Sequence, residues 1–192
     1  WVKPHMGDGG LAVGAALGSA GSTPTQLADA FYGTCADAKG IRAALNVADL
    51  PWQKTPKVHD CVASLLADGG VVARCEGGME WGPRALGNRT ILASPFDESI
   101  NQWLNERLNR SEFMPFAPVV RAEDADRWFL GVEKAPQSAR FMTVCFDVTP
   151  AFKEAAPAAV HVDGTARPQL VDQQTHPDLH RAGHLGVLNA VS

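Results

Sequence analysis

The sequence predicts an α/β (α+β) fold, and two features of the chain indicate this class. Amphipathic helical patterns alternate with short apolar runs that suit β-strands. Hydrophobic residues make up 45% and charged residues 20% of the 192 residues, which is typical of a globular protein with a sizeable core. Because helices and strands are mixed along the chain, an all-α or all-β class is excluded.

Helices are expected over residues 7–17, 36–45, 58–69 and from Asp97 onward. The first contains Gly7-Asp-Gly-Gly, a sequence that lets backbone approach a ligand closely. In the third and fourth, apolar residues recur at helical spacing, and Gly69 and Asp97 supply a C-terminal and an N-terminal cap. The apolar faces are Val58, Cys61, Val62, Leu65 and Leu66, then Ile100, Trp103, Leu104 and Leu108.

Strands are expected in the apolar runs that follow. Residues 70–75 read as a short buried strand, and residues 115–120 are extended because proline disfavours helix at the residue before it. Residues 141–148, 159–162 and 167–171 are also strand-like, with a turn at Asp163-Gly164.

The proline-containing stretch 51–57 indicates a linker between two domains. We therefore expect residues 1–50 to be the end of one domain and residues 58–192 to form another. The chain begins at Trp1, inside what reads as a structured segment, so a fragment of a longer polypeptide is expected.

Charge and cysteine content narrow the class of function. The net charge of −4 argues against a general nucleic-acid or membrane-surface partner, and no apolar run reaches the ~18 residues of a membrane span. Four scattered cysteines do not form a zinc pattern, and Cys61 and Cys145 are expected to be buried free thiols. A cytoplasmic location is the default expectation.

Arginine-containing clusters are the candidates for chemistry. One is the glycine-rich stretch 76–90 with Arg84 and Arg89, one is the helix end 107–110, and one is the polar turn 161–167. No lysine occurs between Lys57 and Lys134, and planar recognition of oxyanions favours arginine. An equally weighted alternative is that the arginines form structural ion pairs. The carboxylates available for such pairs are Glu76, Glu80, Asp97 and Asp163.

Two other patterns are weaker indications of a functional site. His176, His180 and His184 share one stripe of a possible helix, but they lack a supporting carboxylate motif and Gly183 weakens the helix, so a metal site is disfavoured. The faces that hold Trp103 and Trp128 are expected to be core.

Three blocks of the sequence resemble the nodulation and antibiotic O-carbamoyltransferases. They are Glu76-Gly-Gly-Met-Glu-Trp-Gly-Pro-Arg-Ala-Leu-Gly-Asn-Arg-Thr-Ile-Leu, Glu112-Phe-Met-Pro-Phe-Ala-Pro and His161-Val-Asp-Gly-Thr-Ala-Arg-Pro-Gln. Their order and spacing also agree. The segment from Met6 to Ala12 is similar to the end of the family's first domain, and the resemblance covers about nine-tenths of the chain.

The resemblance implies a two-domain enzyme. Residues 1–50 would be the tail of an actin/hexokinase-like domain, and residues 58–192 a twisted mixed sheet like that of threonylcarbamoyl-adenylate synthases. The smaller domain would form carbamoyl-adenylate and pyrophosphate from carbamoyl phosphate and ATP with Mg²⁺. The larger domain, upstream in the same polypeptide, would pass the carbamoyl group to a small hydroxyl acceptor such as a sugar or antibiotic.

The resemblance also implies roles for individual residues. Those expected in catalysis are Arg84, Arg89, His161 and Arg167, and those expected to bind substrate or nucleotide are Gly82, Asn88, Arg110, Asp163 and Thr165. Asp8 resembles a metal-binding aspartate whose histidine partners lie upstream, where a divalent, iron-type metal is expected. The alternatives are a non-catalytic remnant that at most binds nucleotide or carbamoyl phosphate, and, ranked last, a regulatory sensor.

Overall fold

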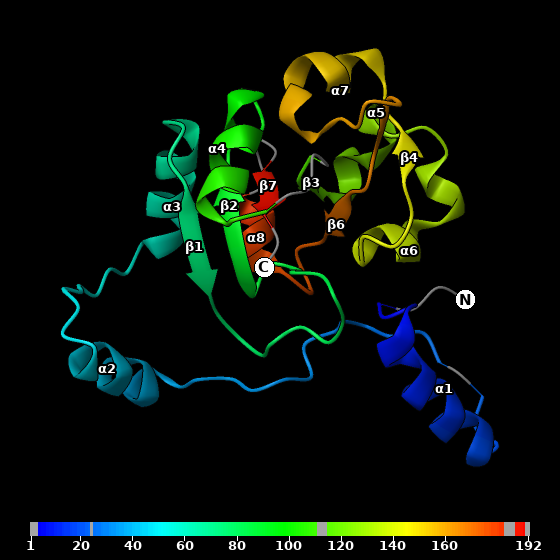
Figure 1. Ribbon diagram of the computed structural model, residues 1–192, viewed down its shortest axis with the longest axis horizontal. Coiled ribbons are helices and arrows are strands. Elements are labelled where there is room, and N and C mark those ends of the chain that lie inside the picture. The colour runs from blue at the N-terminus through cyan, green and yellow to red at the C-terminus, as the bar shows by residue number, and fades with distance from the viewer. Residues whose placement is uncertain (1–3, 24, 111–114, 183–186, 191–192) are drawn as a thin grey trace.

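A five-stranded mixed sheet lies at the centre of the computed structural model, which describes residues 4–23, 25–110, 115–182 and 187–190 (Figure 1). Its strand order is β1-β2-β7-β3-β6; the β3–β6 pair is parallel and the other pairs are antiparallel. These strands are β1 Val72–Cys75, β2 Arg89–Ala93, β3 Ala117–Arg121, β6 Gln169–Val171 and β7 Val187–Ala190. A second sheet pairs β4 Phe146–Asp147 with β5 Thr165–Ala166.

Eight α-helices are described. They are α1 Asp8–Ser19, α2 Ala38–Val47, α3 Val58–Ala67, α4 Ser99–Arg107, α5 Ala125–Trp128, α6 Pro136–Arg140, α7 Pro150–Ala155 and α8 Pro177–Ala182. Short 3₁₀ turns occur at Ala122–Asp124, Val132–Lys134 and Pro157–Ala159. Within the described ranges, no helix is both long and apolar enough to cross a bilayer.

The two faces of the large sheet are covered by different elements. Side chains alternate along a strand, so neighbours in sequence point to opposite faces. One core cluster contains Leu92, Val119 and Val171 with Leu66 of α3 and Leu179 of α8. A larger cluster on the other face contains Ala93, Val120 and Leu170 with Leu104 of α4, Phe116, Phe129 and Phe152.

A third cluster attaches the stretch 27–34 to the sheet. Ala30 is buried with Leu86, Phe141 and other apolar residues. The backbone N–H of Trp81 donates to Ala30 O over 2.7 Å, and two further backbone bonds join residues 33–34 to Met79. Helices α1 and α2 bury no residue and lie away from the sheet in Figure 1. The expected linker 51–57 contains no helix or strand, and the domain boundary itself stays a prediction.

Most of the predicted elements are present, and the α/β class is confirmed. The four predicted helices correspond to α1, α2, α3 and α4, and the extended stretch before residue 120 leads into β3. Two strand predictions were wrong in extent. Residues 141–148 form a strand only at β4, and residues 159–162 form none, because a 3₁₀ turn and a hairpin turn occupy that stretch.

The predicted burial was wrong at several positions. All four cysteines are exposed, including Cys61 and Cys145. Strand β1 alternates half-buried and exposed residues because it is an edge strand. Helix α3 packs on this edge and on α8, so only part of its apolar face is covered and Leu65 stays 54% exposed. Trp103 is 43% exposed, whereas Trp128 packs edge-on against Phe152.

Candidate functional site

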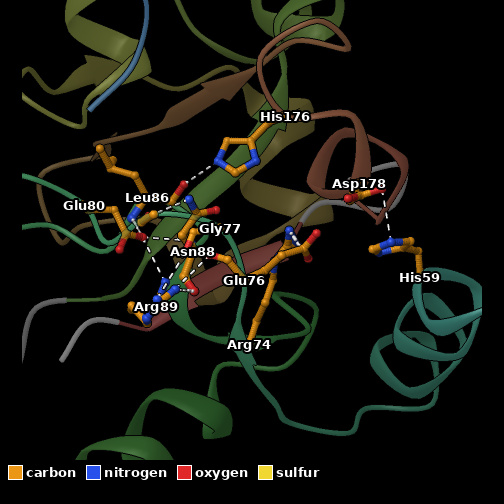
Figure 2. Close-up of polar contacts among 11 residues, drawn as sticks. His59, Arg74, Glu76, Gly77, Glu80, Leu86, Asn88, Arg89, His176 and Asp178 are labelled. Atoms are coloured by element: carbon orange, nitrogen blue, oxygen red, sulfur yellow. Dashed lines mark hydrogen bonds and ion pairs between the residues drawn. The ribbon is translucent and has the colours of Figure 1, made fainter. Parts of the chain in front are cut away.

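The glycine-rich stretch that follows β1 and ends at the first residue of β2, residues 76–89, folds around the carboxylate of Glu80 (Figure 2). One oxygen, Glu80 Oε1, accepts hydrogen bonds from the backbone N–H groups of Leu86, Asn88 and Arg89, over 2.8, 2.8 and 3.1 Å. We call these three N–H groups the amide nest and residues 76–89 the motif loop. Three donors that converge on one oxygen are the arrangement by which backbone binds an anion.

The guanidinium of Arg89 is committed to backbone carbonyls. Its Nη1 donates to the carbonyls of Glu76 and Asn88, and its Nη2 to those of Gly77 and Thr34, over 2.8–3.2 Å. Arg89 therefore joins both arms of the motif loop to the stretch 27–34. This use differs from the direct substrate contact expected of Arg89, a prediction that the geometry leaves untested.

The carbonyl of Leu86 receives two side chains from the far end of the chain. Gln169 Nε2 donates to it over 2.7 Å, and His176 Nε2 lies 3.0 Å away, facing the same oxygen (Figure 2). Because a carbonyl only accepts, the His176 proton lies on Nε2. Burial, and next the charge of Arg74, lower the pKa of His176 below its ordinary value. The ring is neutral at pH 7 and packs edge-on against Phe31.

Three further predicted residues lie in the motif loop. Asn88 is 5% exposed, and its Nδ2 donates to Gly78 O over 2.8 Å. Gly82 adopts a φ of 121°, and a side chain there would crowd the carbonyl of Pro4. Arg84 is half-buried, and its guanidinium forms no hydrogen bond or ion pair with any residue that the structure describes. Its charge is therefore available to a ligand.

The second predicted cluster forms a self-contained hairpin turn. Thr165 Oγ1 donates to Asp163 Oδ1 over 2.8 Å and lies 3.0 Å from His161 Nδ1. The Thr165 hydroxyl has a single proton, which it donates in the hydrogen bond to Asp163. Toward His161 the hydroxyl oxygen can therefore only accept, so the His161 proton lies on Nδ1 and Nε2 carries a lone pair. Hydrogen bonds from the side chain and backbone of Thr165 lower the pKa of Asp163. Burial lowers the pKa of His161, and Arg167 adds to this lowering.

The predicted site residues form two groups. Gly82, Arg84, Asn88 and Arg89 lie in the motif loop, and His161, Asp163, Thr165 and Arg167 lie at the turn. Among the described residues, no side-chain hydrogen bond joins His161, Asp163 or Thr165 to the loop. The guanidinium carbon of Arg110, the other predicted binding residue, lies 4.9 Å from the centre of the Phe116 ring. Of the motif 112–118, residues 112–114 lie outside the described residues, and residues 117–118 begin β3.

Arg84 and Arg89 do not form the structural ion pairs that were the alternative expectation for the arginines. Glu76 pairs with Arg74 over 2.6 Å, and Glu80 binds backbone amides. Asp97 accepts from the Ser99 N–H and Asp163 from Thr165.

The described histidines, cysteines and carboxylates form one group with metal-ligand spacing, and Asp8 is not part of it. Asp8, in the first turn of α1, belongs to no group that could hold an ion in that part of the chain, so one carboxylate does not fit a metal there. His59, Glu76 and Asp178 place one ligand atom each within 4.8 Å of one another. They are already paired, His59 with Asp178 over 3.1 Å and Glu76 with Arg74. His176 and His180 bond to Leu86 and Glu123, and His184 lies outside the described residues.

An open groove of about 790 Å³ lies at the other ends of β1 and β2, beside α4. Its lining includes Asp68, Asp97, Phe96 and Trp103, and it contains no basic residue. A polyanion is therefore disfavoured there, and the motif loop remains the candidate for oxyanion binding.

Sequence reasoning missed three residues that shape the loop. Glu80 was considered only as an ion-pair partner, and Gln169 and His176 were not linked to the loop. The one available signal was that Glu80 and Gln169 lie inside the blocks that carry the family resemblance.

Comparisons with known proteins identify the family of this chain. The family model described as Carbamoyltransferase C-terminus matches residues 63–184, which include the motif loop and the turn. The chain is 38% identical to a 3'-hydroxymethylcephem-O-carbamoyltransferase of Streptomyces clavuligerus, over 68% of this chain and 24% of that protein. It is 34% identical to nodulation protein NolO of Bradyrhizobium diazoefficiens, over 92% of this chain and 34% of that protein. Nodulation protein U of Azorhizobium caulinodans is 33% identical, with coverages of 92% and 30%.

Proposed function

We propose, because this chain belongs to the carbamoyltransferase C-terminus family, that it forms carbamoyl-adenylate for an O-carbamoyltransferase. Water would hydrolyse carbamoyl phosphate to carbamate and inorganic phosphate, and a carbamate oxygen would then attack the α-phosphate of ATP with release of pyrophosphate. The chain spans about a third of the length of the curated relatives it matches. Transfer to a hydroxyl acceptor would therefore take place in an enzyme with an upstream domain, in the cytoplasm.

One observation carries the proposal: the motif loop combines converging backbone N–H groups with the guanidinium of Arg84, which has no hydrogen-bond or ion-pair partner among the described residues. Both substrates are phosphate-bearing anions, and fixed N–H donors with an arginine are the groups that bind phosphoryl oxygens. Mg²⁺ bound to ATP would neutralise part of the phosphate charge. Glu76 and Glu80 are engaged within the loop, so the ion would be held mainly by the nucleotide.

The turn would supply the second set of groups. His161 presents an unprotonated Nε2, and its lowered pKa keeps that nitrogen free of a proton at pH 7. This atom could accept a hydrogen bond or a proton from carbamate or water. Arg167, which acts on the pKa of His161, would add positive charge beside it. Asp163 and Thr165 would fix the imidazole orientation.

Carbamoyl-phosphate-dependent exchange of labelled pyrophosphate into ATP tests this proposal, after circular dichroism has verified folding. We expect exchange above background, and we expect Arg84→Ala to weaken transition-state stabilisation by more than ~2 kcal/mol, which is about 30-fold in kcat/KM. Arg42→Ala, which removes an exposed arginine of α2, is the matched control and should exchange at the wild-type rate. Unchanged kinetics of Arg84→Ala would contradict the assignment. A folded chain that binds phosphate without exchange would favour the non-catalytic alternative.

A further inference from the structure

The amide nest has the geometry of an oxyanion subsite, yet a side chain of the protein fills it. Leu86, Asn88 and Arg89 direct three N–H groups at one carboxylate oxygen of Glu80. A carboxylate oxygen and a phosphoryl oxygen accept hydrogen bonds from the same donors in the same way. Glu80 therefore occupies the position that the oxygen of an anionic ligand would take.

The nest does not depend on Glu80 alone for its shape. Gln169 and His176 hold the carbonyl of Leu86 from one side. Arg89 ties the carbonyls on both arms of the motif loop, as described above. The side-chain Nδ2 of Asn88 donates to Gly78 O, and the backbone carbonyl of Asn88 accepts from the Glu76 N–H over 2.9 Å. These restraints would keep the three N–H groups converging after Glu80 leaves.

The surroundings favour exchange of one anion for another. Glu80 and Arg84 are both half-buried, and Pro83 beside Arg84 is exposed, so solvent reaches this side of the loop. Arg84 lies four residues along the same loop from Glu80, and we expect its guanidinium to pair with a phosphate dianion that the nest binds.

We propose that the amide nest is a phosphoryl-oxygen subsite and that Glu80 is a displaceable occupant of it. This inference rests on the proposed function for the identity of the ligand, a phosphate-bearing substrate. The nest would bind the entering oxygen, and Glu80 would turn out toward solvent. A phosphate would then bind more weakly than it would to an empty nest, because it must displace a carboxylate that already accepts three hydrogen bonds.

Amide resonances of the wild-type chain test where the anion binds. In a ¹⁵N-resolved titration with inorganic phosphate, we expect the N–H signals of Leu86, Asn88 and Arg89 to move together and to saturate. A parallel titration with ATP identifies the source of the oxygen: shifts with phosphate indicate the carbamoyl phosphate position, and shifts with ATP only indicate the nucleotide. Three signals that move with neither probe overturn the proposal.

The Glu80→Gln variant tests displacement, because the proposal predicts the direction in which phosphate affinity changes. Glutamine keeps an oxygen that can accept from the nest but removes the charge, so we expect phosphate to bind at least ~5-fold more tightly by calorimetry. Glu76→Gln is the matched control, because it removes an equal charge from the same loop without touching the nest. Equal or weaker binding by Glu80→Gln, or equal gains in both variants, overturns the proposal. Pyrophosphate exchange is measured separately, so absent exchange with tighter phosphate binding contradicts the proposed function alone.

Discussion

Replacing Arg89 with methionine removes a guanidinium that donates to four backbone carbonyls and retains much of the aliphatic stem. Hydrogen bonds from charged donors contribute about 1.5–3 kcal/mol each at best, and partial exposure reduces this to about 0.5–1 kcal/mol. Four bonds therefore contribute about 2–4 kcal/mol to the free energy of unfolding. For a chain of this size, that corresponds to a Tm lowered by roughly 5–12 °C.

Urea unfolding followed by circular dichroism measures this difference, with Arg84→Met as the matched control. Arg84 lies in the same motif loop but has no hydrogen-bond partner among the described residues, so its replacement should change stability by less than ~0.5 kcal/mol. The two arginines are thereby separated into one that maintains the loop and one that is available to a ligand. If Arg89→Met were as stable as Arg84→Met, the role of the four carbonyl bonds would be refuted.

Two further variants test how the motif loop is held. Because the pKa of His176 is lowered by folding, the unfolded chain binds its proton first, near the ordinary pKa of about 6.5. The free energy of unfolding should decrease as pH falls from about 7.5 to 5, and less so in His176→Gln; equal pH slopes in urea titrations would contradict this. Gly87 has a φ of 105°, and an added Cβ would lie 2.5 Å from Leu179 Cδ2. Gly87→Ala should therefore lower Tm more than Gly69→Ala, which has a similarly positive φ but open space, and equal losses would argue against a steric cause.

Local patterns were sufficient for much of the fold. Helices α3 and α4 follow from apolar residues at helical spacing and from Gly69 just past the end of α3, all of which are properties of adjacent residues. The N-cap of α4 is Glu98 rather than the predicted Asp97, whose carboxylate accepts from the Ser99 N–H. Burial was predicted less well because it depends on which element covers which face. Helix α3 packs mainly on an edge strand and on α8, and Leu66 is its one buried residue, so the sequence pattern indicated more burial than packing provides.

In the candidate site too, residue chemistry could be predicted from the sequence, whereas contacts between distant residues could not. The preference for arginine and the glycines around Arg84 and Arg89 identified the motif loop from residue chemistry alone. The different environments of the two arginines could not be predicted, because one partner of Arg89 is the carbonyl of Thr34, 55 residues away. The importance of Gln169 and His176 to the loop also depends on contacts across more than 80 residues.

The hydrogen bonds to the carbonyl of Leu86 determine which part of the protein unfolds together with the motif loop. By chain connectivity the loop belongs to the β1–β2 hairpin at the sheet edge, the kind of element that opens readily in local fluctuations. Gln169 and His176 couple it instead to β6 and the start of α8, whose Leu179 and Val171 lie in the buried core. Fraying of the hairpin edge can thus leave the loop ordered, while any opening of the β6–α8 unit disorders it. The motif loop, although it lies at the edge of the sheet, thereby resists local unfolding as the core elements do.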